Sequence, residues 1–252
     1  MGGLLSRLVF HPPEVKYPPN SNHIILYTES GTKIPVVFIN RNAPITVVFS
    51  HGNAEDLYET EDWVRSYLLR KVHVNAVIYG NSFFCKGVEY SGYGRNTKFR
   101  PTEKSVYADI MAVYKYLTIN LELNPKSIVL YGKSVGSGPS CYLAERKVIG
   151  GLILHSAFTS IFRVVFNLRF TLPFDIFPNL DRISNIHAPT LIIHGRMDEI
   201  VSFQHALDLY KNAANKVEPY FVPNGGHNDL EDYATDYFKK ITDFISLIQK
   251  KY

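Results

Sequence analysis

Residues 127–138 read SIVLYGKSVGSG, and this stretch decides the fold. Within SIVLY, the residues after Ser127 form a short and continuously apolar run, which is typical of a strand buried on both faces of a sheet. A G-x-S-x-G pentapeptide follows at once, from Gly132 to Gly136, and a helical run begins directly after it. Taken alone, the pentapeptide would fit an ordinary glycine-rich turn. Its place between a strand and a helix predicts that Ser134 is a nucleophile.

The turn around Ser134 has physical requirements that the sequence meets. A sharp turn leaves no room for side chains beside the serine, so both flanking positions need glycine. The turn also brings the hydroxyl to a helix N-terminus, where backbone N–H groups favour developing negative charge. The backbone N–H of Val135 is therefore predicted as one donor of an oxyanion hole. The second donor is expected from the loop after residues 45–50, with Asn53 favoured and Ala54 as the alternative.

Short apolar runs alternate with helical segments along the rest of the chain. This alternation predicts an α/β fold with a mostly parallel central sheet and helices on both faces. Two β-type runs separated by Ser30, Gly31 and Thr32 predict an antiparallel hairpin that opens the sheet. The hairpin strands are residues 23–29 and 33–39. The later strand runs are 45–52, 127–134, 150–157, 190–198 and 218–227. The helical segments are 55–69, 135–145, 203–213 and 230–250.

The length and composition fit one large domain. The chain has 252 residues, of which 46% are apolar and 20% are charged, as in a soluble globular protein. Residues 1–22 contain a Pro- and Asn-rich stretch and are interpreted as an extended lead-in. Residues 23–252 are interpreted as a single α/β domain, expected to be a monomer.

Several classes of function are disfavoured. The net charge of +4 is mild, and no Lys/Arg cluster interleaved with aromatic residues predicts nucleic-acid binding. Cys85 and Cys141 are too few and too far apart for a disulfide scaffold or a zinc knuckle, and no metal or cofactor is expected. No apolar run is long enough to span a bilayer. The N-terminus lacks the features of a secretory signal and fits the myristoylation pattern, with Gly2 as acceptor and Ser6 in the Ser/Thr position.

A serine nucleophile needs a base, and the base needs a carboxylate. Of nine histidines, His227 lies between the last strand run and the last helix, and Asp198 follows the strand run TLIIHG. The order Ser134, Asp198, His227, each beyond a different strand end, is that of an α/β-hydrolase triad. Glu199 is the rival acid, and Asp229 is interpreted as the N-cap of the last helix. Structural roles are expected for the strand-end and turn histidines His51, His155 and His194.

The segment 158–177 has phenylalanine at every fourth position from residue 158 to residue 174. On a helix these side chains would form one drifting aromatic stripe. Phe158, Phe162 and Phe166 are therefore candidates for a substrate pocket. A helix that simply buries this stripe against the sheet is an equally consistent interpretation.

Several longer stretches carry a resemblance to a known family. They are HGNAEDL (51–57), YSGYG (90–94), YADI (107–110) and LYGKSVGSGP (130–139), with LHSAFTS, FDIFPNLDRI, LIIHGRMDEIV and GGHNDLE. The chain resembles the α/β-hydrolase superfamily over nearly its whole length, and most closely the α/β-hydrolase-domain-containing protein 17 group of protein depalmitoylases. The resemblance implies a thioesterase that acts on S-acylated proteins at the cytosolic face of a membrane, with Ser134, Asp198 and His227 in the triad positions.

Three departures from that group stand out. The group anchors itself through an N-terminal cysteine cluster, and here no cysteine precedes Cys85, so any lipid anchor is expected at Gly2. Lys133 replaces the usual neutral glutamine of the elbow and is expected to alter substrate preference. Residues 77–87 look like extra sequence. We expect VHVNAV (72–77) to form a strand between the first parallel strand and the elbow strand, with the remainder leaving the sheet; alternatively, these residues are not part of the working protein.

The leading hypothesis is an acyl-protein thioesterase, cytoplasmic and peripheral on a membrane. The nearest alternative is a small-molecule carboxylesterase or lipid hydrolase, because one triad serves all acyl transfers and a fold does not fix the substrate. An alternative from another class is a catalytically silent binding protein with this fold.

Overall fold

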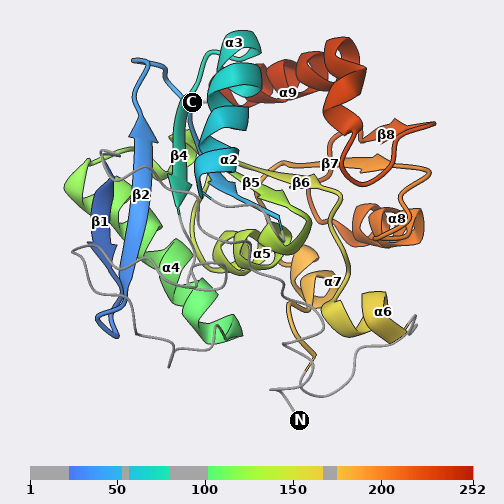
Figure 1. Cartoon of the computed structure of the whole chain (residues 1–252), viewed down its shortest axis with the longest axis horizontal. Coiled ribbons are helices and arrows are strands. Elements are labelled where there is room, and N and C mark those ends of the chain that lie inside the picture. The colour runs from blue at the N-terminus through green and yellow to red at the C-terminus, as the bar shows by residue number, and fades with distance from the viewer. Residues whose placement is uncertain (1–22, 53–56, 80–101, 167–174, 252) are drawn as a thin grey trace.

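A computed structural model describes residues 23–52, 57–79, 102–166 and 175–251. Within them the chain builds an eight-stranded sheet in the order β1-β2-β4-β3-β5-β6-β7-β8 (Figure 1). The strands are β1 Ile24–Tyr27, β2 Lys33–Ile39, β3 Thr46–Ser50, β4 Asn75–Tyr79, β5 Ile128–Lys133, β6 Gly151–His155, β7 Thr190–Gly195 and β8 Tyr220–Val222.

Helices cover both faces of the sheet, so the molecule has three layers (Figure 1). One face carries α2, α3 and α9, and the other carries α4, α5, α7 and α8. Among the described residues, no helix combines the length and the apolar character needed to cross a bilayer. The helices are α2 Leu57–Trp63, η1 Val64–Leu68, α3 Leu69–Lys71, α4 Glu103–Lys115, η2 Tyr116–Asn120, η3 Pro125–Ser127, η4 Ser134–Gly136, α5 Ser137–Arg146, α6 Ile161–Phe166, α7 Asn179–Ile183, α8 Phe203–Asn212, η5 Leu230–Tyr233 and α9 Ala234–Gln249.

The predicted α/β-hydrolase fold is confirmed. β1 and β2 pair antiparallel as the opening hairpin, and β4, β3, β5, β6, β7 and β8 run parallel to one another. The parallel strands read as continuous apolar runs because successive side chains enter opposite cores. In β5, for example, Val129 and Tyr131 pack on the side of α9, whereas Ile128 and Leu130 pack on the side of α5.

The predicted position of the strand after α3 is wrong. β4 comprises Asn75–Tyr79 and lies between β2 and β3, whereas β3 pairs directly with β5. Direct pairing is required because the turn after β5 packs on the end of β3, so no strand can intervene. The Tyr79 hydroxyl forms a hydrogen bond of 2.7 Å with Ser50 Oγ, which fixes the end of β4 on the outer side of β3. The remainder of the extra segment, residues 80–87, lies outside the described residues.

The helix α4 was not expected from the sequence. Its N-terminus is a reciprocal capping box, in which Thr102 Oγ1 accepts from the Ser105 N–H and Ser105 Oγ accepts from the Thr102 N–H. The buried side chains of Val106, Ile110 and Val113 recur at helical spacing. The capping box and this periodicity are the sequence signals that identify the helix.

Burial perturbs His155, His194 and His205. His155 and His194 are fully buried, and His205 is half-buried with its Nδ1 2.8 Å from Thr159 Oγ1. Burial lowers the pKa of all three, and it lowers that of His205 to about 4. A histidine whose pKa is lower in the folded state contributes stability that is complete above its unfolded pKa and is lost as the pH falls toward its folded pKa.

For His205 this loss runs from about pH 6.5 down to about pH 4. We expect its titration to remove about 2 kcal/mol of the free energy of unfolding between pH 7 and pH 5. His205→Gln should show a correspondingly smaller decline between the two pH values in urea unfolding. His187→Gln, at an exposed position, is the control and should decline as the wild type does. An identical decline in the wild type and His205→Gln would contradict the prediction.

Candidate active site

Ser134 sits in the sharp turn between β5 and α5. Its backbone has φ +50°, in the left-handed region that costs a residue with a Cβ about 1–3 kcal/mol. A Cβ at Gly136 would lie 1.9 Å from the Ser50 carbonyl oxygen, and one at Gly132 would lie 2.7 Å from the Gly136 carbonyl oxygen. The prediction that both flanking positions need glycine is therefore confirmed. The turn carries the serine to the C-terminal edge of the sheet.

His227 lies in the loop between β8 and η5 and reaches Ser134. Its Nε2 is 3.1 Å from Ser134 Oγ. The loop is held at its backbone, because Ser156 Oγ donates to the His227 carbonyl at 3.3 Å and the Gly226 N–H donates to Asp229 Oδ1 at 2.6 Å. The prediction of Asp229 as the N-cap of the last helix is wrong, since Tyr233 occupies that position. The Asp229 carboxylate instead closes the turn that presents His227.

Asp198 lies in the loop after β7 and completes the arrangement. Its Oδ2 is 2.7 Å from His227 Nδ1, and its Oδ1 accepts from the N–H groups of Ile200 at 2.9 Å and Val201 at 2.7 Å. Burial alone would raise the pKa of Asp198. The hydrogen bond and electrostatic interaction with His227, the Val201 N–H and the interaction with His194 outweigh burial and lower the pKa. The rival acid Glu199 is exposed.

These three side chains form one hydrogen-bonded chain from carboxylate to imidazole to hydroxyl. They come from the ends of β5, β7 and β8, which meet at the C-terminal edge of the sheet, where ligands bind in open α/β folds. Chemically, the chain can remove a proton from the Ser134 hydroxyl and hold the resulting imidazolium beside an ionised carboxylate. The three residues were predicted from their order in the chain and their positions after strand ends. The structure brings their side chains together.

The other members of the predicted site are placed only in part. Val135 follows Ser134 in the first helical turn, where backbone N–H groups have no intrahelical partner. Asn53 and Ala54, the candidates for the second oxyanion donor, lie outside the described residues, as does Gly2. The oxyanion hole therefore stays a prediction.

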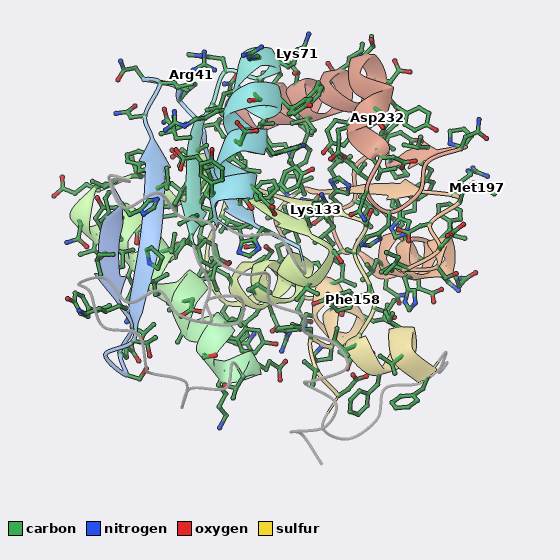
Figure 2. The ribbon with its side chains drawn as sticks, viewed as in Figure 1. Arg41, Lys71, Lys133, Phe158, Met197 and Asp232 are labelled. Atoms are coloured by element: carbon green, nitrogen blue, oxygen red, sulfur yellow. The ribbon has the colours of Figure 1, made fainter. Side chains whose placement is uncertain are left out.

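Lys133 is buried at the end of β5. Its side chain is 10% exposed, and its Nζ lies 4.0 Å from Glu231 Oε1, on the η5 turn directly after the His227 loop. Figure 2 labels Lys133 where β5 leads into the turn before α5. Lys133 therefore links the elbow strand to the segment that carries the base, and its effect on substrate preference stays a prediction.

The aromatic segment does not form one helix through Phe158. Ser160 Oγ accepts from the Arg163 N–H at 3.3 Å, an N-cap bond that starts α6 at Ile161. Phe158 precedes the helix and packs against Phe177, with a distance of 6.5 Å between ring centroids. The expectation of a single helical stripe from Phe158 onward is therefore wrong.

The three candidate pocket residues lie in different surroundings. Phe158 is fully buried beside α7, where Asn179 Nδ2 donates to its carbonyl (Figure 2). Phe162 is half-buried, and Phe166 is 53% exposed. Phe158 and Phe162 belong to a small apolar cluster next to the nucleophile, separate from the two large cores. Its buried members are Val106, Val135, Phe158, Ile161, Phe177 and Val201.

Two further histidines at strand ends have different surroundings. His155 Nδ1 lies 2.7 Å from the Tyr131 hydroxyl and 3.1 Å from the Tyr237 hydroxyl, which fits the structural role expected for it. His194 Nε2 lies 3.3 Å from Asp198 Oδ2, a contact with the site that was not expected. Its sequence signal is its position four residues before Asp198, at the end of the strand that carries the acid.

No metal site is present in the described part of the chain, where no three His, Cys, Asp or Glu side chains gather suitably for an ion. Cys141 is buried, and burial raises the pKa of its thiol to about 12, as befits a structural thiol. Cys85 lies outside the described residues.

Comparison with known proteins identifies the relatives of this chain. No family model matches it. The chain is 39% identical to human alpha/beta hydrolase domain-containing protein 17B over 222 residues, which is 87% of this chain and 73% of the relative. It is also 39% identical to alpha/beta hydrolase domain-containing protein 17C from Xenopus tropicalis, covering 87% of this chain and 68% of the relative.

The chain belongs to the alpha/beta hydrolase domain-containing protein 17 family.

Solved structures agree with the fold of this family member. The Pyrococcus furiosus esterase Pf2001 superimposes with a TM-score of 0.72 at 18% identity, over 94% of this chain and 97% of the esterase. The esterase RhEst1 from Rhodococcus superimposes with a TM-score of 0.65 at 16% identity, over 90% of this chain and 99% of that one. At such identities the likeness concerns the fold alone. Fold and family together support a hydrolase.

The choice of acid in this member of the protein 17 family can be tested directly. Asp198→Asn should lower kcat about 10³–10⁴-fold, because an amide no longer holds the His227 tautomer or stabilises the imidazolium. Glu199→Gln, at the exposed neighbouring position, should keep the wild-type rate. Hydrolysis of a chromogenic short-chain ester is the measurement. A larger loss in Glu199→Gln than in Asp198→Asn would reverse the assignment.

Proposed function

We propose that this protein is a serine hydrolase that cleaves acyl thioesters on S-acylated proteins. The observation that carries the proposal is the chain Asp198–His227–Ser134, with distances of 2.7 Å and 3.1 Å, at the ligand-binding edge of the sheet. Membership in the protein 17 family supports a hydrolase. The thioester specificity rests on the sequence resemblance to protein depalmitoylases, and it is part of the proposal.

The proposed reaction proceeds through an acyl-enzyme. Ser134 Oγ attacks the acyl carbonyl carbon while His227 Nε2 takes the hydroxyl proton, and Asp198 stabilises the imidazolium. The Val135 N–H stabilises the negative oxygen of the tetrahedral intermediate. The carbon–sulfur bond then breaks, and the departing cysteine sulfur receives the proton from His227. Water, deprotonated by His227, attacks the acyl-enzyme. The bond between the acyl carbon and Ser134 Oγ then breaks, His227 returns the proton to Oγ, and the fatty acid is released.

The surroundings of Ser134 support an apolar acyl group. Val135 is the residue after the nucleophile, and it belongs to the apolar cluster that also contains Phe158, Phe177 and Val201. Aliphatic and aromatic side chains at this position favour a hydrocarbon chain over a charged or sugar substrate. The half-buried Phe162 extends the cluster toward the exposed end of α6.

Action at a membrane surface is part of the same proposal. On α6, Val165 is 43% exposed and Phe166 is 53% exposed, next to the cluster beside the nucleophile. A membrane-bound acyl substrate would meet this end of the molecule. An N-terminal myristoyl group on Gly2 would bring the enzyme to the cytosolic face, where the substrate is expected.

The first test is the nucleophile and its substrate. Ser134→Ala should lower turnover of an S-palmitoylated peptide about 10⁵–10⁶-fold, because triad members act as one unit. It should also abolish labelling by a fluorophosphonate serine probe. Ser184→Ala, at an exposed position on the end of α7, is the matched control and should keep both signals.

The outcomes separate the alternatives. Probe labelling that survives in Ser134→Ala would refute the nucleophile assignment. A wild-type protein that neither labels nor turns over any acyl substrate would support the silent binding protein. Faster turnover of oxygen esters than of matched thioesters with the same acyl chain would favour a carboxylesterase or lipid hydrolase.

The second test concerns membrane attachment. We expect Gly2→Ala to move the protein from the membrane fraction to the soluble fraction of cells. One myristoyl chain binds membranes with K of only about 10⁴ M⁻¹, so a second contact is needed, and Val165 and Phe166 are candidates. Fractionation after metabolic labelling with a myristate analogue is the measurement. Equal membrane fractions for wild type and Gly2→Ala would contradict lipid anchoring at Gly2.

A further inference from the structure

His194 has its polar atoms in an unusual position for a core histidine. It is fully buried near the end of β7, and its Nε2 lies 2.8 Å from the Val201 carbonyl oxygen. Since a carbonyl can only accept, Nε2 must carry the hydrogen, which fixes the tautomer. The same Nε2 lies 3.3 Å from Asp198 Oδ2. The N–H therefore faces two oxygens at once, with the carbonyl closer.

This contact completes the surroundings of the Asp198 carboxylate. Oδ1 accepts two backbone N–H groups, from Ile200 and Val201, and Oδ2 accepts His227 Nδ1–H at 2.7 Å. The His194 N–H, with Nε2 3.3 Å from Oδ2, is the fourth N–H group beside the carboxylate. Val201 takes part twice, since its N–H donates to Asp198 and its carbonyl accepts from His194. The buried His194 side chain thus connects the loop that carries Asp198 to the end of β7.

His194 is surrounded by groups that keep it neutral. Burial lowers its pKa; the Val201 carbonyl and the Asp198 carboxylate oppose this shift, and His227 adds to it. The other titratable groups that act on it are His155 at the end of β6, which is buried, and His205 on α8, which is half-buried. Near neutral pH, His194 therefore presents an N–H dipole and not a full charge.

We propose that His194 is a positioning residue of the active site, a neutral N–H donor that orients the Asp198 carboxylate toward His227 and holds it ionised. This role rests on the proposed serine hydrolase function. A fixed dipole orients the carboxylate without cancelling the negative charge that His227 needs when it becomes an imidazolium. A lysine or arginine at the same place would cancel most of that charge.

Two substitutions separate the N–H donor from the packing of the ring. His194→Phe keeps a planar ring but has no donor, whereas His194→Gln places an amide N–H₂ near the position of Nε2. With a chromogenic short-chain ester, we expect His194→Phe to lower kcat about 10–100-fold, as loss of an outer hydrogen-bond partner does in other sites, with KM changed less than about twofold. His194→Gln should recover kcat to within about threefold of the wild type.

The pH profile gives a readout that packing alone would not move. The positive end of the His194 N–H points toward the Asp198–His227 pair and so opposes protonation of the base. Without it, the acid limb of kcat/KM in His194→Phe should move to higher pH, and His194→Gln should restore the wild-type limb. His187→Gln, at an exposed position, is the control and should leave the limb in place.

A measurement without substrate keeps the inference independent of the proposed function. The proton between His227 Nδ1 and Asp198 should give a downfield NMR signal in the wild type, a moved or broadened signal in His194→Phe and a restored signal in His194→Gln. If His194→Phe is not soluble, His194→Met, which is flexible and also lacks the donor, replaces it.

An unmoved signal in both donor-free variants would overturn the inference. So would an active wild type whose His194→Phe variant keeps both kcat and the acid limb. A wild type without any hydrolysis or probe labelling would instead overturn the proposed function, and the NMR comparison would still decide the role of His194.

Discussion

The backbone at the end of β5 packs so closely on the end of β3 that the arrangement of the whole site follows from it. The Gly136 Cα sits against the Ser50 carbonyl, where even one added carbon would lie at 1.9 Å, and Ser134 is held at φ +50°. This packing makes β3 and β5 direct neighbours, and it leaves β4 to the outer side of β3. A strained turn of this kind persists only because the packing of the surrounding sheet holds its backbone in place. As a result, the Ser134 hydroxyl projects from the edge of the sheet.

The acid and the base form a second rigid unit, opposite the serine. The Arg196 N–H donates to the Val222 carbonyl and the Met197 N–H to the Gly225 carbonyl, both at 2.9 Å, so the acid loop and the base loop are joined by their backbones. A Cβ at Gly195 would lie 2.2 Å from the Gly225 carbonyl oxygen, so this approach also requires glycine. Because these hydrogen bonds join the two loops, Asp198 and His227 are held 2.7 Å apart before substrate arrives, and such preorganisation lowers the cost of forming the imidazolium.

Chain order and strand context were enough to predict the sheet and to bring Ser134, Asp198 and His227 together. What failed depends on tertiary contacts that local patterns do not contain. The place of β4 is set by the packing of Gly136 on Ser50, not by the apolar run itself. The start of α6 is set by the Ser160 cap, which overrides the four-residue spacing of the phenylalanines. Asp229 was expected to cap a helix, yet its carboxylate has a nearer donor in the Gly226 N–H.

The groups around the triad stabilise the Asp198 carboxylate without neutralising its negative charge. The donors around its carboxylate are backbone N–H groups and the neutral His194, whereas the buried cation of the region, Lys133, faces Glu231 at 4.0 Å. A buried lysine next to a serine nucleophile would otherwise destabilise the positive charge that forms on His227 during each turnover. Like charges repel each other strongly where water is excluded. Its pairing with Glu231 lets the elbow carry a lysine in place of a neutral residue, because the positive charge is balanced close to where it is buried. The negative charge of Asp198 thus remains available to the base.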